Sequence, residues 1–153
     1  MDVQRASHCT YRIRYHMVFV LKYRKKLLLE KVPIEFVKNL LLEIGERYWF
    51  KFDAIGMEED HVHIVVSAAP RYSPSEVMQI IKSISARMIF KNFKEIKKVL
   101  WGGEFWSDGG HIDTVSDHGG LEKIKKYVQE QGGAKGQLRL SDFNQHTPQL
   151  AAE

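Results

Sequence analysis

Cysteine and long apolar runs are nearly absent from this sequence of 153 residues. Cys9 is the only cysteine, so no internal disulfide can form, and such usage is typical of a reducing cytoplasm. No apolar run reaches the roughly 20 residues of a membrane-spanning helix. The first residues also lack the pattern of a secretory signal peptide. We therefore expect a cytoplasmic protein without a membrane partner.

Charge of one sign is not in large excess either. Lys and Arg number 23 against 19 Asp and Glu, which gives a net charge of +4. This mildly basic balance permits a polyanionic partner but does not require one. A hydrophobic content of 44% is enough for one compact domain. We expect that domain at residues 1–133, because Gly132 and Gly133 follow the last helical pattern, and a loosely ordered polar tail at residues 134–153.

The order of apolar patterns along the chain predicts an α+β fold. Strands are expected where apolar residues alternate, and helices where they recur every three or four residues. A helix start is clearest at Ser73, which can cap a helix whose first residue is Pro74. The predicted elements are a strand at 11–21, a helix at 33–48, strands at 49–57 and 61–67, a helix from Ser73, a short basic helix at 91–100, a strand at 111–115 and a helix at 121–131. This order predicts an antiparallel sheet with helices packed on one face, in the ferredoxin-like split βαβ plan.

The most informative local pattern is His61-Val62-His63, at the start of a predicted strand. Side chains two apart on a strand point to the same face, and their Cα atoms lie about 6.5–7 Å apart. Both imidazoles can therefore bind one metal ion. Two histidines in this spacing are, however, more often structural than metal-binding when nothing else accompanies them.

Tyr127 and Gln131 supply candidates for the rest of such a site. They are four residues apart on the last predicted helix, so their side chains are neighbours on one helical face. Gln131 can offer a carbonyl oxygen as a third ligand beside His61 and His63. Imidazole and oxygen ligands suit Mg²⁺ or Mn²⁺ and do not exclude Zn²⁺ or Co²⁺. A nearby cation would favour the phenolate of Tyr127 and make it a nucleophile toward a phosphodiester.

The combination of these motifs resembles the single-tyrosine HUH transposases of small bacterial and archaeal insertion sequences, a group that includes the REP-associated tyrosine transposases. The resemblance covers about residues 10–132 and is specific because the pieces occur in one order. Those pieces are Tyr15-His16, the basic segment 22–26, Asp60-His61-Val62-His63, the segment 82–87, Leu100-Trp101-Gly102-Gly103, Thr114-Val115, and Tyr127 with Gln131.

The resemblance implies metal-dependent cleavage and rejoining of single-stranded DNA beside a hairpin. Tyr127 would become linked to a 5′ phosphate, with His61 and His63 as the other catalytic residues and Mg²⁺ or Mn²⁺ held by His61, His63 and Gln131. Such enzymes act as homodimers in which Tyr127 of one subunit completes the histidine site of the other. With DNA as substrate, basic side chains become candidates for phosphate contacts. These candidates are Lys22, Arg24, Lys25, Lys82 and Arg87.

Three other functions remain open at this stage. A hydrolase that uses water is disfavoured, because the histidine-triad hydrolases need a third alternating histidine and Val65 stands there. A descendant that only binds nucleic acid is disfavoured by the intact set of candidate catalytic residues. A related enzyme that serves repeated palindromes of a host genome is barely distinguishable from a mobile-element transposase. Outside the motif, His16 is expected to be structural or to support the metal ligands, and Trp101 and Trp106 are expected to be packing anchors.

Overall fold

The computed structural model describes residues 2–116 and 120–130. In chain order the elements are β1 (Gln4–Ala6), β2 (Cys9–Tyr11), β3 (Tyr15–Val20), the 3-10 turn η1 (Lys22–Arg24), α1 (Ile34–Tyr48), β4 (Lys51–Met57), β5 (His61–Ser67), α2 (Pro74–Asn92), α3 (Ile96–Val99), β6 (His111–Thr114) and α4 (Gly120–Glu130). The expected tail at residues 134–153 lies outside the described residues. None of the helices in the described ranges is long and apolar enough to cross a membrane.

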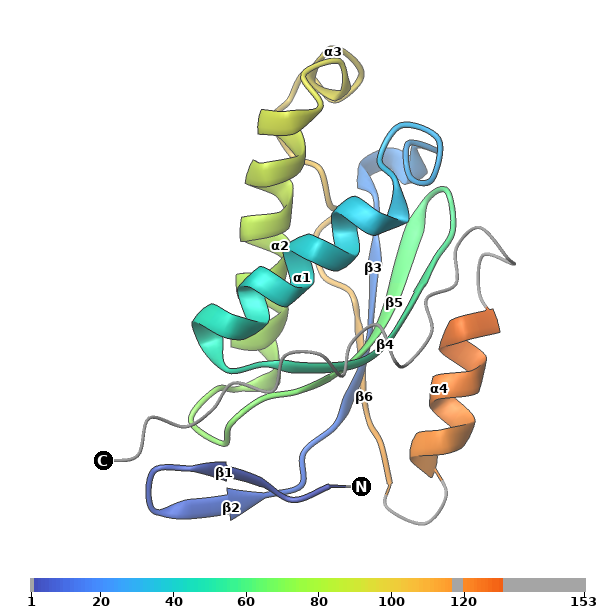
Figure 1. Cartoon of the computed structure of the whole chain (residues 1–153). Coiled ribbons are helices and arrows are strands. Elements are labelled where there is room, and N and C mark those ends of the chain that lie inside the picture. The colour runs from blue at the N-terminus through green and yellow to red at the C-terminus, as the bar shows by residue number, and fades with distance from the viewer. Residues whose placement is uncertain (1, 117–119, 131–153) are drawn as a thin grey trace.

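The main sheet has four strands in the order β4-β5-β3-β6, and every neighbouring pair is antiparallel. The two central strands, β5 and β3, are separated in the chain by α1 and β4 (Figure 1). This arrangement confirms the predicted split βαβ plan. A separate two-stranded hairpin is formed by β1 and β2.

Helices α1 and α2 cover one face of the sheet, over the larger hydrophobic core. Alternate residues of β5 enter this core, among them Ile64, whose side chain is fully buried. Helix α1 follows Pro33 and ends at Trp49, which adopts the left-handed conformation with φ of 64°. Trp49 therefore terminates a helix rather than starting the strand predicted at residues 49–57. Helix α2 begins as predicted, because the Ser73 hydroxyl accepts a hydrogen bond from the backbone N–H of Glu76.

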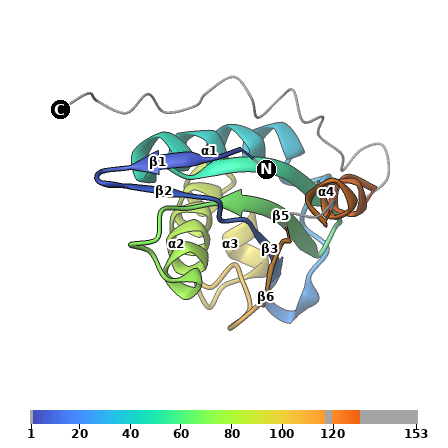
Figure 2. The same cartoon turned by 90° about the horizontal axis from the view of Figure 1, so that it is seen from below.

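Helix α4 lies on the opposite face of the sheet, against β4 and β5 (Figure 2). It closes a second, smaller cluster of buried residues, made of Ala54, Val65, Leu121 and Val128. The expectation of helices on one face only was therefore wrong. The physical reason lies in β5, where six consecutive residues are buried, so both of its faces need a cover.

Two further predictions differ from the structure. The strand predicted at residues 11–21 is split, because β2 pairs with β1 whereas β3 pairs with β5 and β6. Trp106 is a packing anchor as expected, since its ring is buried and its Nε1 donates to the Ser85 hydroxyl at 2.9 Å. Trp101, in contrast, is 88% exposed, so its assignment as a packing anchor was wrong.

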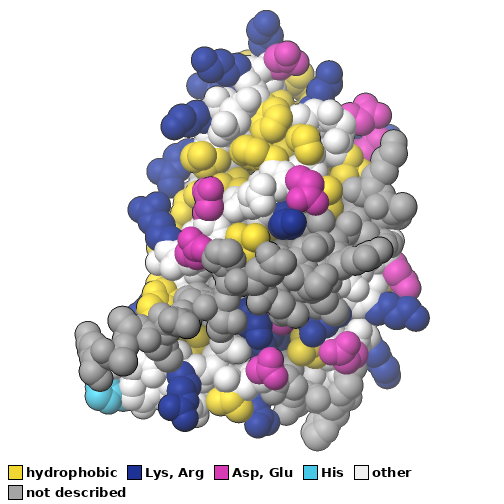
Figure 3. Space-filling view, in the orientation of Figure 1, with side chains coloured by type: hydrophobic (Ala, Val, Ile, Leu, Met, Phe, Trp, Pro, Cys, Tyr) yellow, Lys and Arg dark blue, Asp and Glu magenta, His cyan; other side chains and the backbone are white. Residues whose placement is uncertain are grey.

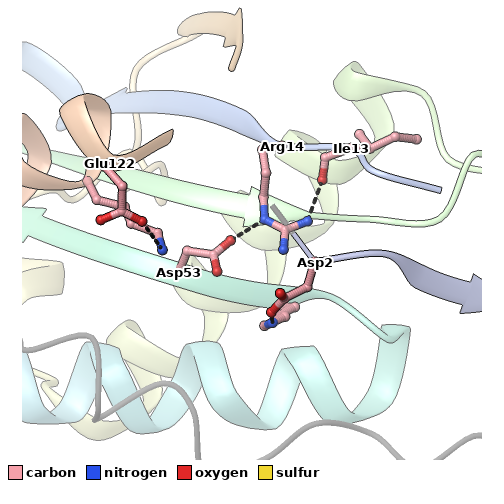
Figure 4. Close-up of polar contacts among 7 residues, drawn as sticks. Asp2, Ile13, Arg14, Asp53 and Glu122 are labelled. Carbon is pink, nitrogen blue, oxygen red and sulfur yellow. Dashed lines mark hydrogen bonds and ion pairs between the residues drawn. The ribbon is translucent and has the colours of Figure 1, made fainter. Parts of the chain in front are cut away.

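A buried ion pair lies beside the central strands. Arg14, just before β3, pairs with Asp53 of β4, and the two side chains are only 1% and 7% exposed (Figure 4). The guanidinium also donates to the carbonyl of Ile13 at 3.1 Å. The pair ties the entry of β3 to β4, with β5 between these two strands.

Candidate active site

One face of the sheet, the face that carries α4, holds a row of polar side chains across three adjacent strands. His61 and His63 project from β5, His16 from β3, and His111 and Asp113 from β6. The strand register explains the grouping: Val18 of β3 lies opposite both His63 and His111, and His16 lies opposite Asp113. Residues two apart on a strand share a face, so the row follows from alternation and register together. We call this set the histidine row.

The two rings of the HxH pair lie close together. The ring centroids of His61 and His63 are 5.0 Å apart, with the planes inclined at 69°. His63 is buried, and the side chain of His61 is 16% exposed. The pair therefore presents two imidazoles at the edge of a largely desolvated surface.

His61 is held by acidic neighbours from the β4–β5 turn. Its Nδ1 lies 2.6 Å from Oδ1 of Asp60, and Oδ2 of Asp60 accepts a hydrogen bond from Nε of Arg24 at 3.2 Å. Burial alone would raise the pKa of the Asp60 carboxyl, but the hydrogen bonds from His61 and Arg24 outweigh burial and lower it. Asp60 is therefore an ionised acceptor at neutral pH. Glu58 lies on the other side, with Oε2 3.7 Å from Nε2 of His61.

His63 contacts a third histidine. Its Nδ1 lies 3.0 Å from Nε2 of His16, and the two rings are stacked with centroids 5.3 Å apart. Burial, followed by the nearby imidazoles of His61, His16 and His111, lowers the pKa of His63 to about 4. Burial also lowers the pKa of His16, opposed by the carboxylate of Asp113. Both buried rings are therefore neutral at pH 7, which is the form that binds metals.

Tyr127 of α4 covers the centre of this row. Its ring lies edge-on to His63 and to His16, with centroid distances of 5.8 Å and 6.1 Å. The helix reaches this place because Leu121 and Val128 are buried against the sheet. Tyr127 itself remains 48% exposed. The structure thus brings Tyr127 against His63, which in turn adjoins His61, while Gln131, the expected third ligand, lies outside the described residues.

The chemistry of these groups fits a divalent cation. Glu58, Asp60 and His61 form the group of three metal-capable side chains found among residues 2–116 and 120–130. The imidazoles of His61 and His63 with the carboxylate of Glu58 form a mixed nitrogen and oxygen donor set, which suits Mn²⁺ and related ions. A half-exposed phenol beside such a set can attack an electrophile that approaches from solvent.

The basic residues expected to contact DNA occupy several different environments. Lys22 forms an ion pair with Glu104 at 2.6 Å, and Arg24 is engaged by Asp60. Lys82 turns inward, where its Nζ donates to the carbonyls of Ser107 at 2.8 Å and Gly109 at 2.6 Å. The remaining two candidates, Lys25 and Arg87, are exposed.

A basic groove lies at the far end of α2, in a segment that the sequence marked only as basic. It has a volume of about 690 Å³, and besides its lysines it is lined by Asn92, Glu95 and the apolar residues Leu27, Phe93, Ile96 and Val99. Its cationic lining residues are Lys31, Lys91, Lys94 and Lys98. In Figure 3, Lys and Arg side chains line the edge of the molecule where α2 and α3 lie. The signal for this groove in the sequence was the recurrence of lysines in the short basic helix predicted at residues 91–100.

The sequence matches known proteins over most of its length. Residues 9–131 match the family described as "Transposase IS200 like". The ISDra2 transposase TnpA of Deinococcus radiodurans is 28% identical over 86% of this chain and 92% of its own length. The transposase of insertion sequence element IS200 from Salmonella typhimurium is also 28% identical, over 85% of this chain and 84% of its own length.

Two solved structures share the fold. A crystal structure described as a transposase from Deinococcus radiodurans R1 superposes with a TM-score of 0.66 at 27% identity, over 86% of this chain and 99% of that one. A REP-associated tyrosine transposase bound to a REP hairpin gives a TM-score of 0.55 at 12% identity, over 78% of this chain and 69% of that one. The family match spans most of the chain and includes the histidine row and Tyr127. The chain therefore belongs to the family of IS200-like transposases, enzymes that cleave and transfer DNA.

Proposed function

We propose that the protein cleaves and rejoins single-stranded DNA beside a hairpin, through a 5′-phosphotyrosine intermediate on Tyr127. The observation that carries the proposal is the position of the Tyr127 ring, 5.8 Å from that of His63 and half-exposed above the histidine row. In the first step the Tyr127 oxygen would attack the phosphorus, and the bond from phosphorus to the 3′ oxygen would break. The 3′ oxygen takes up a proton as the phenol loses one. Because the new bond is still a phosphodiester, a 3′-hydroxyl can reverse the step without a nucleotide cofactor.

The same proposal assigns a divalent ion, Mg²⁺ or Mn²⁺, to His61, His63 and Gln131. When bound, the ion would polarise a phosphodiester oxygen and stabilise charge in the transition state. The chain's own contribution includes the buried imidazole of His63, whose low pKa keeps the ring neutral and able to bind a metal. Glu58, 3.7 Å from Nε2 of His61, is close enough to add a carboxylate oxygen.

DNA binding is proposed to use Lys25 and Arg87 rather than the cations that are engaged by Glu104, by Asp60 or by the carbonyls of the loop before β6. Lys25 and Arg87 remain candidates on this basis. The lysine-lined groove at the end of α2 adds a larger positive surface that suits phosphates. Lys82 and Arg24 are proposed to act on DNA only indirectly, through the loop and the carboxylate that they hold.

A homodimer with shared active sites is also proposed, as the resemblance to HUH transposases implies. In the single chain α4 packs on its own sheet through a small cluster of apolar residues. An identical sheet in a second subunit offers the same docking surface. Mixing His63→Ala subunits with Tyr127→Phe subunits tests the sharing. We expect the mixture to regain covalent attachment, on the subunit that keeps Tyr127. If the mixture forms no covalent adduct, His63 and Tyr127 of the same chain must act together, and the active site is not shared.

The test of the function itself is covalent capture of DNA. The protein is incubated with hairpin-bearing single-stranded DNA and Mn²⁺ or Mg²⁺, then denatured and run on a gel. We expect an adduct that is lost with EDTA and with Tyr127→Phe but kept with Tyr23→Phe, since Tyr23 is a 77% exposed tyrosine outside the site. An adduct that survives Tyr127→Phe, or cleavage without any adduct, overturns the proposal. Binding of the hairpin without cleavage by the wild type favours a descendant that only binds nucleic acid.

A further inference from the structure

Both histidines of the HxH pair have the same ring nitrogen, Nδ1, occupied by a neighbouring side chain. We infer that two carboxylates, Asp60 directly and Asp113 through His16, orient the two proposed metal ligands so that both present Nε2 to the ion. The inference rests on the proposed metal site and names the residues that position its ligands. It also assigns a role to His16, Asp113 and Arg24, none of which needs to touch the ion or the DNA.

The first arm is a direct carboxylate–histidine contact. Nδ1 of His61 lies 2.6 Å from Oδ1 of Asp60. A carboxylate can only accept here, so Nδ1 of His61 is the donor to Asp60, and Nε2 is the nitrogen left to face the ion, with Oε2 of Glu58 3.7 Å away on the same side. Arg24 holds the other oxygen of Asp60 at 3.2 Å and so fixes the carboxylate in place.

The second arm is longer and passes through His16. The 3.0 Å contact between Nδ1 of His63 and Nε2 of His16 needs one donor. If His63 donates, His16 must carry its own proton on Nδ1, and that atom faces Oδ2 of Asp113 at 3.8 Å. The protons then point toward the Asp113 carboxylate, which lies within ion-pair distance of His16 and accepts a hydrogen bond from Nε2 of His111 at 2.6 Å. The opposite direction would aim the proton-free Nδ1 of His16 at the Asp113 carboxylate, an unfavourable meeting of two acceptors.

The two arms have the same physical effect. Metal-binding histidines commonly donate their second ring N–H to a carboxylate or carbonyl, which fixes the tautomer and raises the basicity of the ligating nitrogen. Here the acceptors come from three different segments: the β4–β5 turn, β3 and β6. His16 is buried between the sheet and α4, so its ring cannot easily adopt another orientation. Asp60, Asp113, His16 and Arg24 are thus positioning residues for the proposed metal site.

The first test reads the tautomers without metal or DNA. Two-bond ¹H–¹⁵N correlation spectra of ¹⁵N-labelled, metal-free protein at pH 7.5 distinguish a ring protonated on Nδ1 from one protonated on Nε2. We expect His61 and His63 both to be protonated on Nδ1, the less common tautomer of a free imidazole. Protonation of either ring on Nε2 overturns the inference.

The second test measures Mn²⁺ affinity by calorimetry with the full chain. Asp113→Asn keeps the shape of the side chain but removes the charge, and loss of such a partner typically weakens metal binding about 10–100-fold. Asp113→Glu should recover part of that loss. Glu104→Gln is the matched control, because Glu104 is also 58% exposed and ion-paired but lies with Lys22 instead of the histidines. Wild-type affinity in Asp113→Asn overturns the inference alone, whereas absence of Mn²⁺ binding by the wild type overturns the proposed metal site as well.

Discussion

Tyr127 and His63 meet edge to face, with ring centroids 5.8 Å apart and planes inclined at 82°. One partner is buried in the sheet and the other is half-exposed on α4. This contact brings a proposed metal ligand that is buried next to a proposed nucleophile that is open to solvent. It also means that α4 need not move for Tyr127 to reach the histidine row of its own chain.

The low pKa of His63 predicts that acid destabilises the metal-free protein. The unfolded chain takes up a proton near pH 6.5, whereas His63 in the folded state does so only near pH 4. Between these values the unfolded state binds more protons, so the free energy of unfolding falls as pH falls from 6.5 to 4. The contribution of His63 is at most about 3 kcal/mol. Urea denaturation in the presence of EDTA, at several pH values, measures it.

His63→Gln is expected to flatten part of this pH dependence, because glutamine does not titrate. Some slope should remain, since burial also lowers the pKa of His16 and acts in the same direction. His8→Gln is the control, because His8 is exposed in the turn between β1 and β2 and takes no part in the histidine row. A His63→Gln profile as steep as that of the wild type would contradict the assigned pKa.

Much of this site could be predicted from local sequence. Alternation places His61 and His63 on one face of a strand, and helical spacing identifies Tyr127 on the edge of an apolar stripe. The contact of His16 with His63 could not be found in the same way. It joins residues 47 apart in the chain and depends on the register of β3 against β5. Asp113 required the register of a third strand.

The errors have a common physical origin, because each concerns what a side chain meets after folding. Helix α4 was expected on the same face as the other helices, yet the buried β5 needed a cover on its second face. Trp101 was expected in the core, but the core is filled by Trp106 and Phe105 instead. Local pattern identifies an amphipathic element more readily than the surface it will cover.

The inward position of Lys82 predicts that its replacement acts through the loop before β6. Lys82→Met removes the donor to the carbonyls of Ser107 and Gly109 and leaves both without that partner. We expect the free energy of unfolding to fall by about 1–3 kcal/mol. Hairpin affinity should change only as far as displacement of the loop disturbs the DNA surface. Thermal unfolding measures the first effect, and fluorescence anisotropy with labelled hairpin DNA measures the second.

Lys25→Met is the comparison for this prediction, because Lys25 is exposed. It should leave stability within about 0.5 kcal/mol of the wild type. Because Lys25 is proposed to contact a phosphate, Lys25→Met should also weaken DNA binding and reduce the dependence of hairpin affinity on salt. The reverse pattern, in which Lys82→Met alone affects DNA binding at unchanged stability, would return Lys82 to the DNA surface.

The basic groove predicts a specific change in the salt dependence of DNA binding. Replacing Lys94 and Lys98 together by Gln should lower the slope of log affinity against log salt by about two, because each lysine that neutralises a phosphate adds about one to that slope. Cleavage at saturating DNA should change little, because both lysines lie in or next to α3, far from α4, which carries Tyr127 (Figure 1). An unchanged slope would remove the groove from the DNA surface.

The Arg14–Asp53 pair predicts a large and asymmetric effect on stability. Arg14→Ala leaves the Asp53 carboxylate buried without its cation, and breaking a buried pair in this way costs about 3–5 kcal/mol. Replacing both by apolar residues, as in Arg14→Met with Asp53→Leu, should recover most of the loss because no buried charge remains.

The pair of Lys51 with Asp2 is the control, since Asp2 is 82% exposed (Figure 4). Asp2→Ala should cost no more than about 1 kcal/mol, the usual value of an exposed pair. Urea denaturation of the three variants decides the matter: equal losses for Arg14→Ala and Asp2→Ala would show that the buried position of the first pair carries no special cost.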